Sequence, residues 1–503
     1  MTIFEKKNLI KFLKKNKKKR IVLCHGVFDV VHYGHILHFK TAKELGDVLI
    51  VSITKDKFIK KGLNRPIFNE SQRYNYLNEI QLIDFVYICD TESAADSIEI
   101  IKPKFYVKGP DYKNNLLDDS KKIYLEKSLV EKFKGKIVYT NDKKYSSSTI
   151  INNKNLINFN LEQEDFVKKI RSKYTFEEIV NKIKNFNKIK TLLVGELIFD
   201  CYSFGEVVGK SGKEPHLVIK ENKVEYYVGG TGAIARHLST FVKNINLICP
   251  FGEEPFLKKI LNDNLHKNIS QNLLKPEKYY SSIIKKRFID EVSNYKMFGS
   301  YILPGRPRDI FYNKLDKKIK SKIKSNDMLI ICDYGHEFID RKIANNISKI
   351  KKFKALNVQL NSSNKGFNPL NNYHNFDAVI INQSELRQEL REEKLEINIL
   401  AQSLIKKNSI KNLIVTKGKN GVSLYRKNLK PIHCPAFINS SVDKVGAGDA
   451  MLSIISIALK QNLDPEIVLF LGSIAAAINV NNVGNKVAID IDEIIRIIQF
   501  FLR

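Results

Sequence analysis

Residues 21–35 read IVLCHGVFDVVHYGH, an apolar run that leads through a glycine-containing turn into a helical pattern ending near residue 45. Further apolar runs of strand length follow at residues 47–53, 84–90, 104–109 and 136–140. Strands that alternate with helical segments indicate a parallel, doubly wound α/β sheet. We therefore predict a small Rossmann-like domain over residues 1–154.

A second α/β pattern opens with TLLVGELIFD at residues 191–200 and continues to the C-terminus. Its other strand candidates are NINLICPFG, DMLIICDYG, ALNVQL, FDAVIIN and NLIVTKG, which begin at residues 244, 327, 355, 376 and 412. Residues 155–188 are charged and carry apolar residues at helical spacing, which predicts a helical linker that includes the first helix of the second domain. We expect two doubly wound α/β domains, the second and larger one spanning residues 189–503.

The chain is strongly basic. Its 503 residues include 84 Lys and Arg against 54 Asp and Glu, a net charge of +30. The basic residues are mostly lysines spread along the whole chain, whereas a nucleic-acid site would more often gather arginines and aromatic residues in one region. We therefore interpret the charge as a solvated surface that steers phosphorylated small molecules, with a basic nucleic-acid-binding protein as the alternative.

Targeting and redox features predict a cytoplasmic protein. No apolar run reaches the roughly 18 residues of a transmembrane helix, and the N-terminus lacks the apolar core of a secretory signal. The six cysteines lie far apart, without a CxxC pair or zinc-ligand spacing. Such sparse cysteines indicate a reducing compartment, buried thiols and no structural metal.

Two histidines mark the start of the helix that follows the first strand. His32 and His35 are three residues apart and face the same side of that helix, whose free N–H groups attract phosphate. Gly26 allows the backbone to approach a ligand closely. Two imidazoles in this place can donate hydrogen bonds to a triphosphate and to the charge that develops on its α-phosphorus. The alternative is a pair of helix-capping histidines.

The segment HYGH resembles the HxGH signature of the nucleotidyltransferase superfamily, which includes cytidylyl- and adenylyltransferases. KKGLNRPIFNESQR (60–73), YVKGPDY (106–112) and YSSSTII (145–151) are similar to further motifs of that superfamily, and the second resembles its heptose-phosphate adenylyltransferase branch. The resemblance implies catalytic roles for His32 and His35. It assigns nucleotide binding to Gly26, Phe28, Lys61, Arg65, Arg73, Asp111, Ser147, Ser148 and Thr149. For His25, which departs from the family pattern, nucleotide contact and a structural role in the turn both stay open.

A second phosphate-binding pattern, DKVGAGDA at residues 443–450, precedes an apolar helical run. Gly446, Ala447 and Gly448 let consecutive N–H groups converge at a helix start, which makes an anion hole for a transferring phosphoryl group. Asp449 can take the proton of a substrate hydroxyl as that hydroxyl attacks. The pattern predicts a phosphotransferase site, with an ordinary helix-capping turn as the alternative.

DKVGAGD fits the DxxGAGD signature of the ribokinase-like sugar kinases, and the chain resembles that family from about residue 191 onward. VGELIFD, VGGTGAIARHL, NQSE and VTKGKNG, beginning at residues 194, 228, 382 and 415, are similar to its other motifs, and VGELIFD looks like its first strand. The resemblance assigns the catalytic base to Asp449 and Mg²⁺ to Asn382 and Glu385. It assigns ATP binding to Thr416, Gly418, Gly421, Gly446, Ala447 and Gly448. It assigns sugar binding to Asp200, Gly229, Gly230, Lys210 and Asp443, with a plain surface position as the alternative for Lys210.

Ala233 stands where relatives commonly carry Asn, so a hydrogen bond directed at the sugar is absent there and the precise sugar stays open.

Together the two resemblances predict a bifunctional enzyme. The kinase would phosphorylate a sugar with ATP, and the transferase would couple AMP to a sugar 1-phosphate and release pyrophosphate, giving an activated sugar for lipopolysaccharide, capsule or another surface glycan. Bacterial bifunctional heptose kinase/adenylyltransferases have both activities with the domains in the opposite order, which makes a heptose derivative the leading sugar. The alternatives are a CTP-dependent transferase fused to a kinase for another sugar or polyol, or one inactive domain that serves as a binding module. Relatives of both domains are often dimers, and we expect no membrane or specific nucleic-acid partner.

Overall fold

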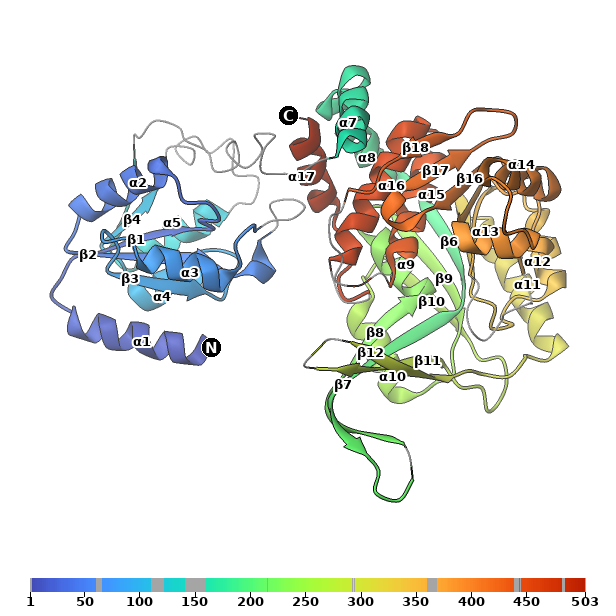
Figure 1. The fold of residues 1–503 in the computed structure, drawn as a ribbon, viewed down its shortest axis with the longest axis horizontal. Helices are drawn as coiled ribbons and strands as arrows, with labels where there is room; N and C mark the ends of the chain where they lie inside the picture. Colours follow the sequence, from blue (N-terminus) through green and yellow to red (C-terminus); the bar gives the residue numbers. More distant parts are fainter. Residues whose placement is uncertain are drawn as a thin grey trace. The chain divides into compact units, whose positions relative to one another are not determined.

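The computed structural model describes residues 2–59, 66–109, 122–140, 160–214, 216–291, 293, 295–359, 369–437, 443, 445–481 and 485–502. The chain divides into two compact units, Met1–Phe159 and Asn160–Arg503. Each unit is built on its own mainly parallel sheet (Figure 1). The α/β class predicted from the sequence is confirmed.

The first unit contains a five-stranded parallel sheet in the order β3-β2-β1-β4-β5. Its strands are β1 (Ile21–Gly26), β2 (Val48–Thr54), β3 (Phe85–Cys89), β4 (Phe105–Lys108) and β5 (Lys136–Tyr139). Its described helices are α1 (Thr2–Lys15), α2 (Tyr33–Glu44), η1 (Asp56–Phe58), α3 (Glu70–Asn78), α4 (Ala95–Ile101) and α5 (Lys122–Lys132). The strand order reverses at β1, so the carboxyl ends of β1 and β4 border the crevice where such sheets bind ligands.

Strand β1 shows how both faces of this sheet are buried. Val22 and Cys24 belong to an apolar cluster with Phe39 of α2. Leu23 belongs to a second cluster with Ile98 of α4. Successive side chains of a strand point to opposite faces, so a sheet covered on both sides requires the uninterrupted apolar run that the sequence has here.

The second unit contains a nine-stranded sheet in the order β10-β9-β6-β13-β14-β15-β16-β17-β18, parallel as far as β16 and antiparallel beyond it. Its strands are β6 (Lys190–Gly195), β9 (Asn244–Pro250), β10 (Ile269–Leu274), β13 (Met328–Asp333), β14 (Phe353–Val358), β15 (Ala378–Asn382), β16 (Asn412–Thr416), β17 (Val422–Tyr425) and β18 (Ile432–Cys434). Its described helices are α7 (Leu161–Lys173), α8 (Phe176–Lys184), η4 (Asn185–Lys188), α9 (Thr231–Ser239), α10 (Pro255–Asn264), α11 (Asp309–Ile323), α12 (Arg341–Ser348), η5 (Pro369–Asn372), α13 (Gln383–Leu390), α14 (Ile397–Asn408), η6 (Gly418–Asn420), α15 (Ala447–Lys460), α16 (Pro465–Val480) and α17 (Ile491–Leu502).

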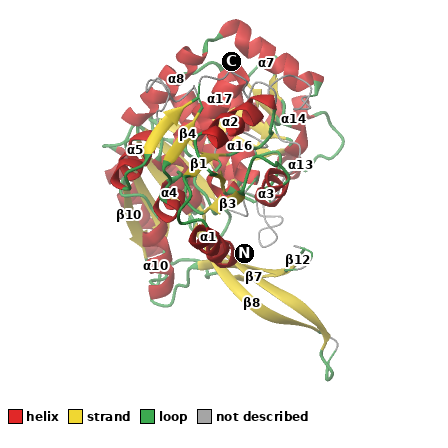
Figure 2. Ribbon diagram, turned by 90° about the vertical axis from the view of Figure 1, so that its left-hand side faces the viewer, coloured by secondary structure: helices red, strands yellow, loops and turns green. Residues whose placement is uncertain are grey.

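A smaller sheet of four strands accompanies the large one, in the order β12-β11-β7-β8. Its strands are β7 (Leu197–Lys210), β8 (Leu217–Gly230), β11 (Ile283–Asp290) and β12 (Lys296–Ile302). Strands β7 and β8 form a long hairpin that extends away from the rest of the second unit (Figures 1 and 2). Much of β8 and β12 is exposed, and such strands lack the apolar run by which a buried strand is recognised.

The run TLLVGELIFD is not a single strand, contrary to the expectation that VGELIFD forms the first strand. The chain leaves the nine-stranded sheet at Glu196, because β6 ends at Gly195 and β7 begins at Leu197 in the other sheet. Asp200 therefore lies on β7. The sequence shows no sign of this break, because both strands are buried here and the apolar run continues across it.

We expected residues 155–188 to form a helical linker that includes the first helix of the second domain. Residues 160–188 pack on the second unit as α7, α8 and η4. Phe166 lies against Phe437 and Phe470, and the Arg171 side chain donates to the carbonyl of Phe501 at 2.7 Å. The segment is therefore part of the second unit from Asn160 onward.

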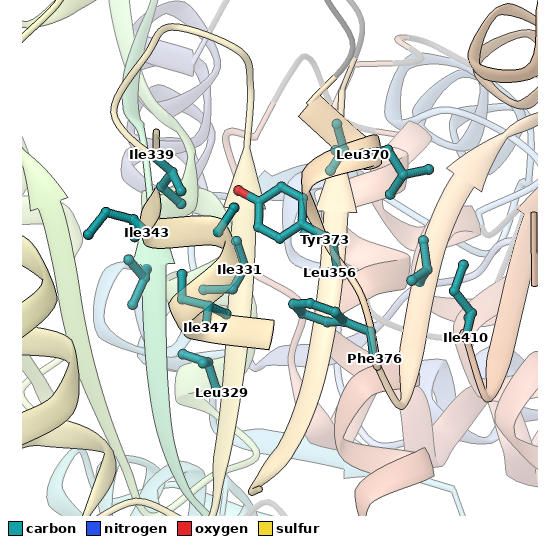
Figure 3. Packing of buried hydrophobic residues seen from close by; sticks show 14 of the residues in the cluster. Leu329, Ile331, Ile339, Ile343, Ile347, Leu356, Leu370, Tyr373, Phe376 and Ile410 are labelled. Atoms are coloured by element: carbon teal, nitrogen blue, oxygen red, sulfur yellow. The ribbon is translucent and has the colours of Figure 1, made fainter. Parts of the chain in front are cut away.

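The core of the second unit includes a cluster beneath β13, β14 and β15, in which Ile331, Leu356, Leu370, Tyr373 and Phe376 pack together (Figure 3). All six cysteines of the chain are buried and unpaired, as predicted. In the described part of the chain, no helix combines the length and apolar character needed to cross a membrane.

Candidate functional sites

The first candidate site lies where β1 passes into α2. His32 caps α2: its Nδ1 accepts the N–H of Gly34 at 3.1 Å, and the N–H of His32 points to Nδ1 of His35 at 3.3 Å. The two rings are stacked with their centroids 4.0 Å apart. Because Nδ1 of each ring accepts a backbone N–H, the proton of each neutral ring lies on Nε2, which is then a hydrogen-bond donor. Burial lowers the pKa of His32, which favours this neutral form.

The capping interpretation of these histidines and the catalytic one are therefore compatible. The cap uses only Nδ1 of each ring. Phe28 completes the turn with φ +48°, and a Cβ on Gly26 would come within 3.2 Å of its ring. A larger residue in place of Gly26 would displace that ring, which also contacts His35 edge-on.

His25 and Lys108 stand at the ends of the two strands that border the crevice. His25 contacts the hydroxyl of Ser52 at 2.8 Å through Nδ1 and that of Thr54 at 3.3 Å through Nε2, which supports its structural interpretation. Lys108, at the end of β4, is buried and forms an ion pair with Glu126 of α5 at 3.0 Å. No sequence pattern marks this pair, because Glu126 lies in a helix with no recognisable motif.

Glu126 joins several elements around that ion pair. One oxygen accepts the N–H of Ala94, and the other accepts the hydroxyl of Tyr106, each at 3.0 Å. Burial opposes ionisation of Glu126, yet Lys108, His25 and the Ala94 N–H lower its pKa. The ion pair ties β4 to α5.

Arg73, predicted to contact phosphate, is instead fully enclosed by protein, with 0% of its surface exposed. Its guanidinium donates to the carbonyls of Val27 and Thr54 at 2.6 and 2.8 Å. It also donates to the carbonyl of Phe68 and to the carboxylate of Asp56. Arg73 thus holds the loop before His32 to the end of β2, and its donors are used within the protein. Sequence could not distinguish this role, since an arginine near phosphate-binding motifs fits both.

The other nucleotide contacts expected in this unit, Lys61, Arg65, Asp111, Ser147, Ser148 and Thr149, lie outside the described residues.

The second candidate site is a cavity of about 840 Å³ in the second unit. Its wall includes many of the residues that we assigned from the sequence, namely Asp200, Gly230, Asn382, Glu385, Thr416, Gly418, Gly421, Gly446, Ala447, Gly448 and Asp449. Gly229 stands directly behind Asp200, since a Cβ there would lie 2.2 Å from its Oδ2. Motifs that are up to 250 residues apart in the sequence thus meet at one cavity.

Besides Gly229, two assigned residues, Lys210 and Asp443, are not among the residues that line this cavity. Lys210 lies at the far end of β7, paired with Leu217 across the hairpin. Asp443 is buried beside the cavity, where it accepts hydrogen bonds from the Tyr202 hydroxyl at 3.1 Å and from the Lys296 ammonium at 2.7 Å. These contacts hold the start of the GAGD segment against the four-stranded sheet.

Asp449 occupies the first turn of α15. Gly446 caps that helix with φ +87°, a conformation that favours glycine. A Cβ there would also lie 2.0 Å from Oδ1 of Asn485. Burial raises the pKa of Asp449 to about 7, partly offset by a hydrogen bond from the Tyr334 hydroxyl at 3.0 Å. A carboxylate that titrates near neutral pH suits a general base.

The opposite wall carries charges from β7 and β11. Asp200 forms an ion pair with Arg287 at 2.6 Å. Lys285, two residues before Arg287 on the same strand, also lines the cavity and is only 7% exposed. Burial lowers the pKa of Lys285, and the nearby Asp200 carboxylate opposes that shift. The segment IIKKRFID gave no signal for this role, because lysines are common throughout this chain.

Asn382 and Glu385 form a reciprocal helix cap at the cavity wall. The Glu385 N–H donates to Asn382 Oδ1 at 2.8 Å, and the Asn382 N–H donates to Glu385 Oε2 at 2.9 Å. Among the described residues, no group of three or more His, Cys, Asp or Glu could hold a metal ion by itself. Mg²⁺ commonly takes one or two carboxylates together with substrate phosphates and water. The buried Glu385 carboxylate at the cavity wall fits that mode of binding.

Fold and sites together define a chain of two α/β units, each with a candidate phosphate-binding site. Residues 188–491 match the pfkB family carbohydrate kinases, and residues 23–154 match the cytidylyltransferase-like family. The chain belongs to the pfkB family of carbohydrate kinases and carries a cytidylyltransferase-like domain at its N-terminal side.

Curated relatives match the two parts separately. The bifunctional protein HldE of Campylobacter jejuni (strain RM1221) is 44% identical over 117 residues, which is 23% of this chain and 25% of that protein. The chain thus spans about a quarter of the length of this relative. An uncharacterized sugar kinase of Buchnera aphidicola subsp. Schizaphis graminum is 27% identical over 311 residues, covering 61% of this chain and 95% of that protein.

Solved structures resemble the fold of the second unit. Phosphofructokinase-2 from Escherichia coli in complex with potassium has a TM-score of 0.51 at 17% identity, covering 63% of this chain and 99% of that one. The same enzyme in complex with substrates and products has a TM-score of 0.51 at 18% identity, covering 63% and 100%. These likenesses establish the fold.

Proposed function

We propose that this chain phosphorylates a heptose derivative with ATP and couples AMP to a sugar 1-phosphate, giving a nucleotide-activated sugar. The activated sugar would be made in the cytoplasm for lipopolysaccharide, capsule or another surface glycan. The observation that carries the proposal is that Asp449, the glycine-rich turn before it and Asp200 line one cavity, while a separate unit presents His32 and His35 at a helix start. Similarity of the N-terminal unit to a bifunctional relative supports the pairing of activities.

In the kinase step, Asp449 takes the proton of a sugar hydroxyl as the hydroxyl oxygen attacks the γ-phosphorus of ATP. The bond between the γ-phosphorus and the bridging oxygen breaks, and ADP leaves. The N–H groups at the start of α15 face the phosphoryl oxygens, where negative charge accumulates. Lys285 and Arg287 orient the sugar from the opposite wall together with Asp200.

Mg²⁺ would be held by Glu385, with Asn382 fixing the orientation of that carboxylate. Bound there with the ATP phosphates, the ion supplies charge neutralisation on the phosphate oxygens.

In the transferase step, a phosphate oxygen of the sugar 1-phosphate attacks the α-phosphorus of ATP, and pyrophosphate leaves. The Nε2–H groups of His32 and His35 donate to phosphate oxygens whose charge grows in the transition state. No side chain forms a covalent bond in this step. Arg73 acts indirectly, because it fixes the loop that carries Val27 and Phe28.

The test uses the purified full-length chain with ATP or CTP and a panel of heptoses, heptose phosphates and sugar 1-phosphates. ADP and pyrophosphate release are followed separately, with hexose analogues as matched controls. We expect ADP release with a heptose derivative and pyrophosphate release with ATP plus a heptose 1-phosphate. Pyrophosphate release from CTP plus a sugar 1-phosphate, but not from ATP, would support the cytidylyltransferase alternative. No pyrophosphate release with either nucleotide and any sugar 1-phosphate would refute the transferase assignment.

A further inference from the structure

Glu196 occupies the break between β6 and β7, where the chain passes from one sheet to the other. It is completely buried, with 0% of its surface exposed. Both oxygens of its carboxylate bind the turn after β13: Oε2 accepts the N–H of Tyr334 at 2.8 Å, and Oε1 accepts the N–H of His336 at 3.1 Å. A buried carboxylate whose two oxygens bind the backbone of one turn fixes the position of that turn.

The same turn carries the Tyr334 hydroxyl, which contacts the candidate base Asp449. Tyr334 lines the cavity, and its hydroxyl donates to Oδ1 of Asp449 at 3.0 Å. The Tyr334 ring is 2% exposed, so its hydroxyl position follows the position of the backbone. The backbone of Tyr334 is in turn held by Glu196.

A second carboxylate supports the turn from below. Asp333 accepts the N–H of Gly335 at 2.9 Å and the hydroxyl of Tyr373 at 2.8 Å. The Tyr373 ring is packed among apolar residues of the core cluster (Figure 3). Burial, together with the nearby Asp333 charge, raises the pKa of Glu196 to about 8. Glu196 and Asp333 are thus two acidic side chains that are held in the interior by hydrogen bonds to one turn.

Glu196 also contacts the sugar side of the cavity through its backbone. Its carbonyl accepts the N–H of Thr231 at 3.1 Å. A Cβ on the neighbouring Gly230 would lie 2.8 Å from that carbonyl oxygen. One residue therefore links the glycine pair at the start of α9 to the turn that reaches Asp449.

We propose that Glu196 is a positioning residue for the kinase, which holds the turn 334–336 so that the Tyr334 hydroxyl stays hydrogen-bonded to Asp449. This inference rests on the proposed role of Asp449 as the base. Tyr334 stabilises the ionised form of Asp449, and Asp200 and Lys285 are the other charged groups that act on it. Loss of the Tyr334 contact should therefore make Asp449 harder to ionise.

The test is a double-mutant cycle on kcat against pH, using the full-length chain, ATP and the heptose derivative of the panel with the highest kcat/KM. We expect each of Tyr334→Phe and Glu196→Gln to move the acidic limb of the kcat–pH profile to higher pH by about one unit. Glutamine can accept only one of the two N–H groups, and its amide group opposes the other. The double variant should show no further shift, because both changes remove the same contact.

The matched control is Asp327→Asn. Asp327 accepts the N–H of Lys190 at 2.8 Å at the opposite end of the β6–β13 pair. This variant removes the charge of a carboxylate that binds a backbone N–H away from the cavity, and it should leave the acidic limb unchanged.

An unshifted limb in Glu196→Gln, or a shift that adds to that of Tyr334→Phe, would overturn the proposal. If Glu196→Gln does not fold, as judged by circular dichroism, Glu196→Asp replaces it in the same cycle, because it withdraws the carboxylate from the turn by one methylene. Failure of the base assignment is recognised separately: Asp449→Asn would then keep its kinase activity whatever the other variants do.

Discussion

His32 and His35 stack on each other at the start of α2, with ring centroids 4.0 Å apart, and each uses Nδ1 to accept a backbone N–H. The helix cap therefore fixes both rings, and the tautomer that it selects makes Nε2 of each ring a hydrogen-bond donor. One arrangement serves both the stability of the helix start and the proposed chemistry.

This arrangement predicts that His32→Asn separates the two roles. Asparagine is a good N-cap residue, so α2 should persist while the Nε2–H donor is lost. We expect pyrophosphate release to fall by about 100-fold or more, with little change in the thermal midpoint. Calorimetry and the pyrophosphate assay check this, and undiminished pyrophosphate release would show that His32 only caps the helix.

The kinase should lose activity as the pH falls through about 7. Burial raises the pKa of Asp449 to about 7, and the base must be ionised to accept the hydroxyl proton. Below that pH the carboxyl is protonated and kcat should fall about tenfold per pH unit. ADP release measured between pH 5 and 9 tests this; a flat profile across that range would contradict it.

Lys285→Met should raise the stability of the protein and lower its kinase activity. The ammonium is desolvated in the cavity wall, so replacing it with an apolar side chain of similar length should raise the thermal midpoint. The same change should lower kinase kcat/KM by about tenfold or more. Lys286→Met is the matched control, since its ammonium binds Glu221 and is partly exposed. A lower midpoint for Lys285→Met, or unchanged kinetics, would argue against this role.

Arg73→Lys should weaken the first unit. A single ammonium cannot reproduce the bonds from the Arg73 guanidinium to Val27, Thr54, Phe68 and Asp56. We expect the free energy of unfolding to drop by about 2 kcal/mol or more, with pyrophosphate release reduced and ADP release retained. Urea denaturation with both assays tests this, and a variant of normal stability with reduced nucleotide affinity would restore the phosphate-binding interpretation.

Much of the fold was predictable because buried parallel strands require long apolar runs. Strands β1 to β3 appear in the sequence in this form, and the glycine-rich turn before Asp449 carries its own chemical signature. The four-stranded sheet was not predicted, because apolar and polar residues alternate only weakly along its exposed strands. In addition, the break at Glu196 lies inside a continuous apolar run. Lys285 and Glu196 were missed for a further reason: their roles arise from contacts with residues that are distant in the sequence, such as Tyr334.

The central claim is that one chain carries two independent active sites, and one crossed assay tests it most directly. Asp449→Asn and His32→Asn are each assayed for ADP release with ATP and the heptose derivative, and for pyrophosphate release with ATP and a supplied heptose 1-phosphate. We predict that Asp449→Asn abolishes ADP release and retains pyrophosphate release, and that His32→Asn does the reverse. Loss of both activities together in either folded variant would contradict the two-site account.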